Sequence, residues 1–127
     1  MEPVAVVIGL ALAEYFYFLM KCGAARGRLG VPAPATGGNA EFERYFRVQY
    51  NTIEQLVIFL PGMLLFGTYV DPMIAAGVGL VFVLGRALYG RGYVVDPARR
   101  GPGFLLTIVS NLVLLVGGIV GAIRAWL

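Results

Sequence analysis

Residues 44 to 55 carry a cluster of polar side chains that could bind a small charged molecule. The cluster consists of Arg44, Arg47, Gln49, Asn51, Glu54 and Gln55. An α-helix turns by about 100° per residue, so all of these except Gln49 fall within roughly a third of its circumference. Arginine can bind a carboxylate through two hydrogen bonds, a buried glutamate accepts an ammonium group, and amide side chains pair with peptide groups. The spacing therefore favours a site for a small zwitterionic ligand.

The same residues also allow a purely structural interpretation. Arg47 and Glu54 lie about two helical turns apart, so they could neutralise each other and tie helices together. Glu14 or Arg86 could complete such an ion network, because ionisable groups inside membrane bundles usually pair with one another.

A second polar face favours the binding interpretation. Arg86, Tyr89 and Tyr93 recur at steps of three and four residues, so they share one side of a helix. Arg99 and Arg100 follow in the next loop. We expect both polar faces to converge at one membrane boundary.

The elements that position these residues are predicted to be membrane helices. Hydrophobic residues make up 59% of the 127-residue chain, which is typical of a protein that uses the bilayer as solvent. Four apolar runs approach the ~20 residues that an α-helix needs to cross the hydrocarbon core. They predict an all-α, integral membrane four-helix bundle that forms one domain over residues 1–127, with helices at about 3–22, 43–69, 72–93 and 103–126. Residues 23–41 are rich in Gly, Pro and Ala and are predicted to form a loop.

The distribution of charge predicts the orientation of these helices. Basic residues gather around the first and third loops, whereas the second loop and the N-terminus contain none. By the positive-inside rule, loops one and three are cytoplasmic and both termini lie outside.

The composition also excludes several kinds of chemistry. The chain has no histidine and a single cysteine, Cys22, so an imidazole base and an intramolecular disulfide are both excluded. A metal site built from Cys and His is not expected, and neither is a nucleic-acid partner. Cysteine at the end of an apolar helix usually behaves as a small hydrophobic residue, which is our interpretation of Cys22.

Two motifs resemble one known family. The stretch "EFERYFRVQYNTIEQ" (residues 41–55) is similar to the start of the second helix in the MAPEG family, the membrane-associated proteins in eicosanoid and glutathione metabolism. The stretch "RALYGRGY" (residues 86–93) is similar to the end of that family's third helix. The resemblance covers nearly the whole chain and is strongest to the branch with leukotriene C4 synthase and the microsomal glutathione transferases, in a short form typical of bacteria.

The resemblance implies a homotrimer that binds glutathione at the subunit boundary near the cytoplasmic side. Residues of one subunit would line the tripeptide: Arg47, Asn51, Glu54, Tyr89 and Tyr93. Arg26 and Gln49 would contact it from the neighbouring subunit. Gln55 stands where leukotriene C4 synthase has an aromatic residue, and we count it with the ligand-binding set. Arg100 occupies the position of the arginine that stabilises the glutathione thiolate.

The implied activity is that of a membrane-bound glutathione transferase. A thiol with a pKa of about 8.5 is mostly protonated at neutral pH, whereas the thiolate is the nucleophile. An arginine that lowers this pKa by about 2 supplies about 2.7 kcal/mol of differential stabilisation. A site that opens toward membrane lipid would suit a hydrophobic electrophile or, in a glutathione peroxidase reaction, a lipid hydroperoxide. The sequence therefore predicts a multi-pass enzyme of a bacterial inner membrane.

Two alternatives come from other functional classes. One is a non-catalytic lipid-binding or scaffold protein, like the family's lipoxygenase-activating member. The other is a small transporter, which would place its polar residues at the middle of the membrane. Glu14 is the one residue that favours the transporter.

Overall fold

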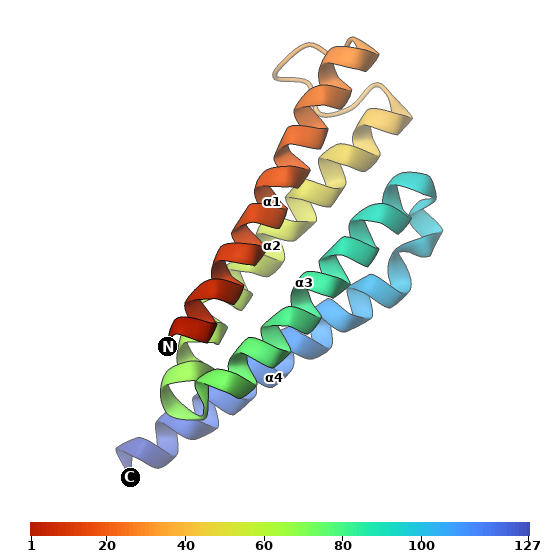
Figure 1. The fold of residues 1–127 in the computed structure, drawn as a ribbon. Helices are drawn as coiled ribbons and strands as arrows, with labels where there is room; N and C mark the ends of the chain where they lie inside the picture. The colour runs from red at the N-terminus through yellow and green to blue at the C-terminus, as the bar shows by residue number, and fades with distance from the viewer.

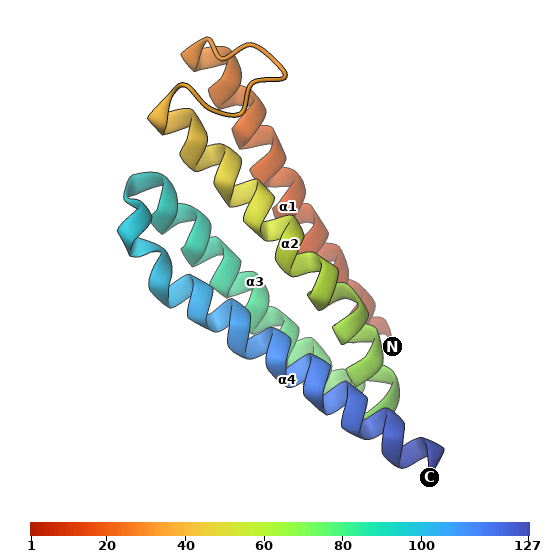
Figure 2. The ribbon, with the colours of Figure 1, turned by 180° about the vertical axis from the view of Figure 1, so that it is seen from behind.

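Four long helices form an antiparallel bundle. The computed structural model describes all 127 residues. It contains α1 (Glu2–Leu29), α2 (Ala40–Tyr69), α3 (Pro72–Val95) and α4 (Gly101–Trp126), with a short 3₁₀ helix, η1 (Pro97–Arg100), before α4. Both termini lie at one end of the bundle together with the α2–α3 turn (Figure 1). The α1–α2 and α3–α4 connections lie at the opposite end, which we call the connection end (Figures 1 and 2).

The four membrane spans expected from the sequence are confirmed as four long apolar helices. Each helix has the length and composition needed to cross a membrane, counting η1 together with α4. Large apolar side chains are exposed along all four helices. Helices satisfy their own backbone hydrogen bonds, so such apolar surfaces are suited to contact with lipid.

The first helix is longer than the sequence analysis predicts. Residues 23–29 continue α1 instead of starting the loop. Cys22 and Ala25 pack in a small cluster with Val31 and with Phe42 of α2, which gives this extension a buried face. Gly30 then ends the helix with a φ of 67°, a left-handed conformation that favours glycine. Tertiary packing thus overrides the weak helical pattern of a segment that contains two glycines.

The ends predicted at residues 69, 72 and 126 agree with the structure, whereas the start of α2, the end of α3 and the start of α4 differ by two or three residues. The side chain of Asn39 accepts a hydrogen bond from the backbone N–H of Phe42 at 3.0 Å, so α2 begins at Ala40. The third helix continues to Val95. Asp96 then accepts from Ala98 N–H at 3.0 Å and starts η1, which leads into α4 at Gly101.

Glycines set the close contact between α3 and α4. A Cβ atom at Gly103 would collide with the backbone nitrogen of Tyr89 and would lie 2.6 Å from the carbonyl oxygen of Gly85. A Cβ atom at Gly85 would in turn lie 3.1 Å from the carbonyl oxygen of Gly103. Small residues let helix backbones approach closely in membranes. This contact brings the start of α4 against the polar face of α3.

Candidate functional site

A fully buried arginine lies at the centre of the polar residues. Arg86 of α3 has no exposed surface. Its guanidinium donates to Asn51 Oδ1 at 2.8 Å, to Thr52 Oγ1 at 2.9 Å and to Thr107 Oγ1 at 3.3 Å. These four residues, which we call the polar network, join α2, α3 and α4. A charged donor at this depth is retained only when acceptors surround it, so the network fixes how the three helices pack.

The aromatic residues of α3 extend this network toward the connection end. The guanidinium carbon of Arg86 lies 4.1 Å from the centre of the Tyr89 ring, which is within the range of a cation–π interaction. Tyr89 stacks on Tyr93, with ring centroids 5.5 Å apart. Tyr89 is almost completely buried, whereas Tyr93 is partly exposed. Arg47 of α2 and Arg100 of η1 are both exposed.

Arg47 and Glu54, both in α2, form an exposed ion pair. Arg47 Nη2 lies 3.6 Å from Glu54 Oε1, and the two side chains retain 47% and 49% of their exposure. The structural interpretation of this pair is correct in part, because the two charges do meet. Arg86 is not its partner, since the guanidinium of Arg86 binds neutral oxygens in the interior. An exposed pair contributes little to stability, so both charges can be offered to a ligand.

The structure places Arg100 at the surface of the short η1 helix. Its guanidinium makes one long contact, 3.5 Å to the carbonyl oxygen of Pro97. Arg99 is also exposed and makes no side-chain hydrogen bond. Both arginines are thus free to bind an anion.

Three of the predicted site residues already have partners or lie inside the chain. Gln55 Oε1 accepts a hydrogen bond from Asn111 of α4 at 3.0 Å. Gln49 is only 9% exposed. Arg26 donates to the carbonyl oxygens of Ala35 at 2.8 Å and Val31 at 3.4 Å, and so holds the α1–α2 loop.

Apart from Gln49 and Gln55, the structure therefore divides the predicted set into three groups within one chain. Arg47, Glu54, Tyr93 and Arg100 keep exposed surface. Asn51 and Tyr89 lie beneath them, where both contact Arg86. Arg26 belongs to a separate cluster with Phe42, whose ring centre lies 4.7 Å from its guanidinium carbon.

Four buried polar residues, Thr52, Thr107, Ser110 and Asn111, lie beyond the set predicted from the sequence. Thr52 was not included with the polar face of residues 44–55, although it lies beside Asn51. Thr107, Ser110 and Asn111 recur at steps of three and four residues in the otherwise apolar α4, and all three are buried. That spacing was the available signal, because polar side chains grouped on one face of a membrane helix usually point to an interior contact.

No group of three or more Asp, Glu, Cys or His side chains is arranged to hold a metal ion. Cys22 packs as a small hydrophobic residue in the cluster beneath the α1–α2 loop.

Comparison with known proteins places the chain in a family. The sequence model of the MAPEG family matches residues 4–120. An uncharacterized protein of Synechocystis sp. is 48% identical over 115 residues, which cover 91% of this chain and 84% of that protein. Human microsomal glutathione S-transferase 2 is 35% identical over 123 residues, which cover 97% of this chain and 84% of the human protein. Rat leukotriene C4 synthase is 33% identical over an alignment of 129 residues that covers 95% of this chain and 86% of the rat protein. The chain therefore belongs to the MAPEG family.

Proposed function

We propose that this protein is a membrane-bound glutathione transferase that joins the glutathione thiolate to hydrophobic electrophiles. The observation that carries the proposal is the exposed pair of Arg47 and Glu54, in a chain related over nearly its whole length to a glutathione transferase. Glutathione carries two carboxylates and one ammonium group. Arg47 would bind a carboxylate and Glu54 the ammonium, in place of the bond that they make to each other.

The polar network supports this site from the interior. Asn51 and Tyr89 would form the floor on which the tripeptide rests, and Arg86 holds both of them in place. Gln55 would set the spacing between α2 and α4 through Asn111. Preorganised side chains lose little freedom when the ligand binds, which increases affinity.

Arg100 would stabilise the thiolate. Its side chain is exposed and its only hydrogen bond within the chain is 3.5 Å long, so its charge is available to an anion. The thiol proton leaves to solvent, and the thiolate sulfur then bonds to the electrophilic carbon while the leaving group departs. With a lipid hydroperoxide, two glutathione molecules would be oxidised to the disulfide while the hydroperoxide is reduced to an alcohol and water.

The complete site would include a neighbouring subunit. In the proposed homotrimer, Arg26 and Gln49 of one copy approach the tripeptide held by the next copy. We further propose that the connection end faces the cytoplasm, because the basic residues concentrate there. An opening between subunits would admit hydrophobic substrates from the lipid.

The experiment compares two adjacent arginines in the detergent-purified protein. Glutathione binding is measured by calorimetry, thiolate formation by its ultraviolet absorbance, and conjugation with an aryl halide. Arg100→Ala is expected to keep glutathione binding but to lower the rate at pH 7 about 25-fold, because raising the thiol pKa from about 6.5 to about 8.5 reduces the thiolate from about three quarters of the bound glutathione to about 3%. Arg99→Ala, the matched control, removes the same charge one residue away and is expected to retain the thiolate.

Two results would contradict the proposal. An unchanged pH profile of conjugation in Arg100→Ala would remove the assigned role from Arg100. Absence of glutathione binding by the wild-type protein at millimolar concentration would favour a non-catalytic lipid-binding protein instead.

A further inference from the structure

A cavity lies between α1, α2 and α3 near the connection end. It has a volume of about 450 Å³, which is within the range of small-molecule sites, roughly 300–1,000 Å³. None of the four exposed residues of the proposed glutathione site lines it. Phe18 and Val48 line the cavity and pack with Tyr89 in one buried cluster, so this cluster lies between the cavity and the glutathione site.

The wall of the cavity is mostly apolar. Phe18 from α1, Val48 from α2 and Gly90 with Val94 from α3 contribute to it. A Cβ atom at Gly90 would lie 2.8 Å from the Phe18 ring, so the helices meet closely here. This surface suits a hydrocarbon chain, which needs no hydrogen bonds from its surroundings.

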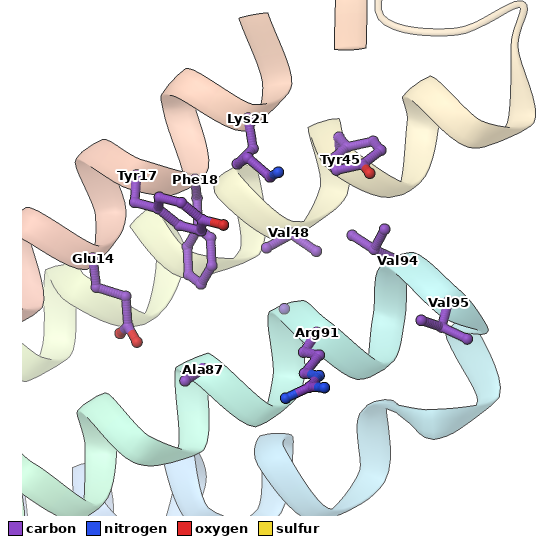
Figure 3. A pocket seen from close by; sticks show the side chains of 11 residues that line it. Glu14, Tyr17, Phe18, Lys21, Tyr45, Val48, Ala87, Arg91, Val94 and Val95 are labelled. Carbon is purple, nitrogen blue, oxygen red and sulfur yellow. The ribbon is translucent and has the colours of Figure 1, made fainter. Parts of the chain in front are cut away.

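Two cations line this cavity, one from α1 and one from α3. Lys21 of α1 and Arg91 of α3 both line it (Figure 3). Each is exposed, and neither makes a hydrogen bond or an ion pair within the chain. The Lys21 ammonium contacts only the Tyr17 ring, at 5.8 Å from its centre. Their charges are therefore available to an anion at the outer part of the cavity.

The inner part of the cavity holds the carboxyl group of Glu14. Glu14 lines it about two helical turns, or roughly 10 Å along α1, from Lys21. One carboxylate oxygen of Glu14, Oε1, is buried without a hydrogen bond. Glu14 also interacts with the charge of Arg86, for which it is the only carboxylate among the charged neighbours. A phosphate finds no cation in the cavity lining at this depth, whereas the outer part offers Lys21 and Arg91, so the phosphate of an occupant would lie at the outer part.

We propose that this cavity binds an anionic phospholipid, with its phosphate between Lys21 and Arg91 and one acyl chain against Phe18, Val48 and Gly90. Basic residues at the end of a membrane helix attract anionic headgroups, and basic pockets between helices select them. A membrane lipid is the amphiphile that meets this opening at the highest concentration. The inference does not depend on the proposed glutathione activity, because the two sites share no exposed residue.

The test uses native mass spectrometry of the full chain in detergent with equal amounts of phosphatidylglycerol and phosphatidylcholine. The wild-type protein should retain phosphatidylglycerol preferentially. Lys21→Gln with Arg91→Gln should reduce this preference by about fivefold for each cation removed. The matched control, Arg99→Gln with Arg124→Gln, removes two exposed cations outside the cavity and should keep the preference.

A larger side chain in the cavity tests whether the lipid binds inside the cavity or only to the charged surface. Ala87 is exposed and lines the cavity, so Ala87→Trp should displace the acyl chain while Lys21 and Arg91 remain. Ala87→Leu is the milder form, and circular dichroism checks the fold of both. Loss of retained lipid in these variants supports the proposal. If they retain phosphatidylglycerol like the wild type, the headgroup binds only to the surface and the proposal is wrong.

Two further outcomes would also overturn it. Glycerol phosphate, which has the headgroup charge without the chains, should not displace the lipid at equal concentration; displacement would assign the site to a free phosphate. An equal loss of the phosphatidylglycerol preference in the Arg99→Gln, Arg124→Gln control would show that the preference depends only on net charge. Glutathione binding should be unchanged in all cavity variants, so a failure here is distinguishable from a failure of the proposed function.

Discussion

Replacing Asn51 with leucine would remove the shortest of the three hydrogen bonds that the buried Arg86 guanidinium donates. The charge would remain in the interior with the Thr52 and Thr107 hydroxyl oxygens as its only side-chain acceptors. We therefore expect Asn51→Leu to lower the free energy of unfolding, and we expect this loss to depend on the presence of the guanidinium.

The magnitude follows from the kind of bond that is lost. Hydrogen bonds to charged groups contribute about 1.5–3 kcal/mol in soluble proteins, whereas bonds between side chains in membrane helices average about 0.6 and reach about 1.7 kcal/mol. A 2.8 Å bond to a fully buried charge belongs at the upper end of the membrane range. We expect a loss of about 1.5 kcal/mol. In an Arg86→Met background no buried charge is left without an acceptor, so the same substitution should cost less than about 0.5 kcal/mol.

The assay is a double-mutant cycle, with unfolding followed by circular dichroism in mixed micelles of increasing denaturing detergent. Asn51→Leu, Arg86→Met and the double variant give a coupling energy of about 1 kcal/mol if the network is as described. Asn111→Leu provides the matched control, because Asn111 is also a buried asparagine but binds Gln55 rather than Arg86. Additive effects of Asn51→Leu and Arg86→Met would refute the reasoning.

Three other variants test the packing and the proposed ligand contacts. Gly103→Ala should lower the melting temperature, because its Cβ would meet the backbone of α3 and overpacking costs about 1–3 kcal/mol; Gly77→Ala, which meets nothing within 4 Å, should not lower it. Arg47→Gln should change the free energy of unfolding by less than about 1 kcal/mol, because the pair with Glu54 is exposed. The same variant should weaken glutathione binding at least tenfold. The control Arg28→Gln breaks the exposed 3.0 Å pair with Glu41 and should leave glutathione affinity unchanged. Equal affinities in these two variants would remove Arg47 from the site. Gln55→Ala should lower stability by about 0.6–1.7 kcal/mol through the loss of Asn111 as a partner, and a large loss of glutathione affinity by calorimetry would instead indicate direct contact with the ligand.

The local pattern of the sequence was sufficient to predict the membrane helices and the two polar faces. Apolar length defines a span because the bilayer has a fixed thickness, and helical periodicity defines a face because the turn per residue is constant. Both depend only on residues near one another in the chain. The helical ends were less predictable: the extension of α1 to Leu29 depends on contacts of Cys22 and Ala25 with Phe42, which lies beyond the loop.

The candidate site required the tertiary structure for a different reason. The sequence placed Arg86 with Tyr89 and Tyr93 on one face of a helix, but it did not show which partners that face meets. The close approach of α3 and α4 at Gly85 and Gly103 brings Thr107 to Arg86, and the packing of α2 brings Asn51 and Thr52. The rotation of each helix about its own axis is set by such contacts.

The sequence by itself determined that the chain consists of four apolar helices, that its charges concentrate at the connection end, and that it lacks an imidazole. These properties follow from composition and period. Only the tertiary structure decided which polar groups remain accessible: Arg47, Glu54 and Arg100 stay exposed, whereas Arg86, Asn51 and Tyr89 are buried. The physical reason is that a buried charge must find acceptors on neighbouring helices, and these become available only when the helices pack.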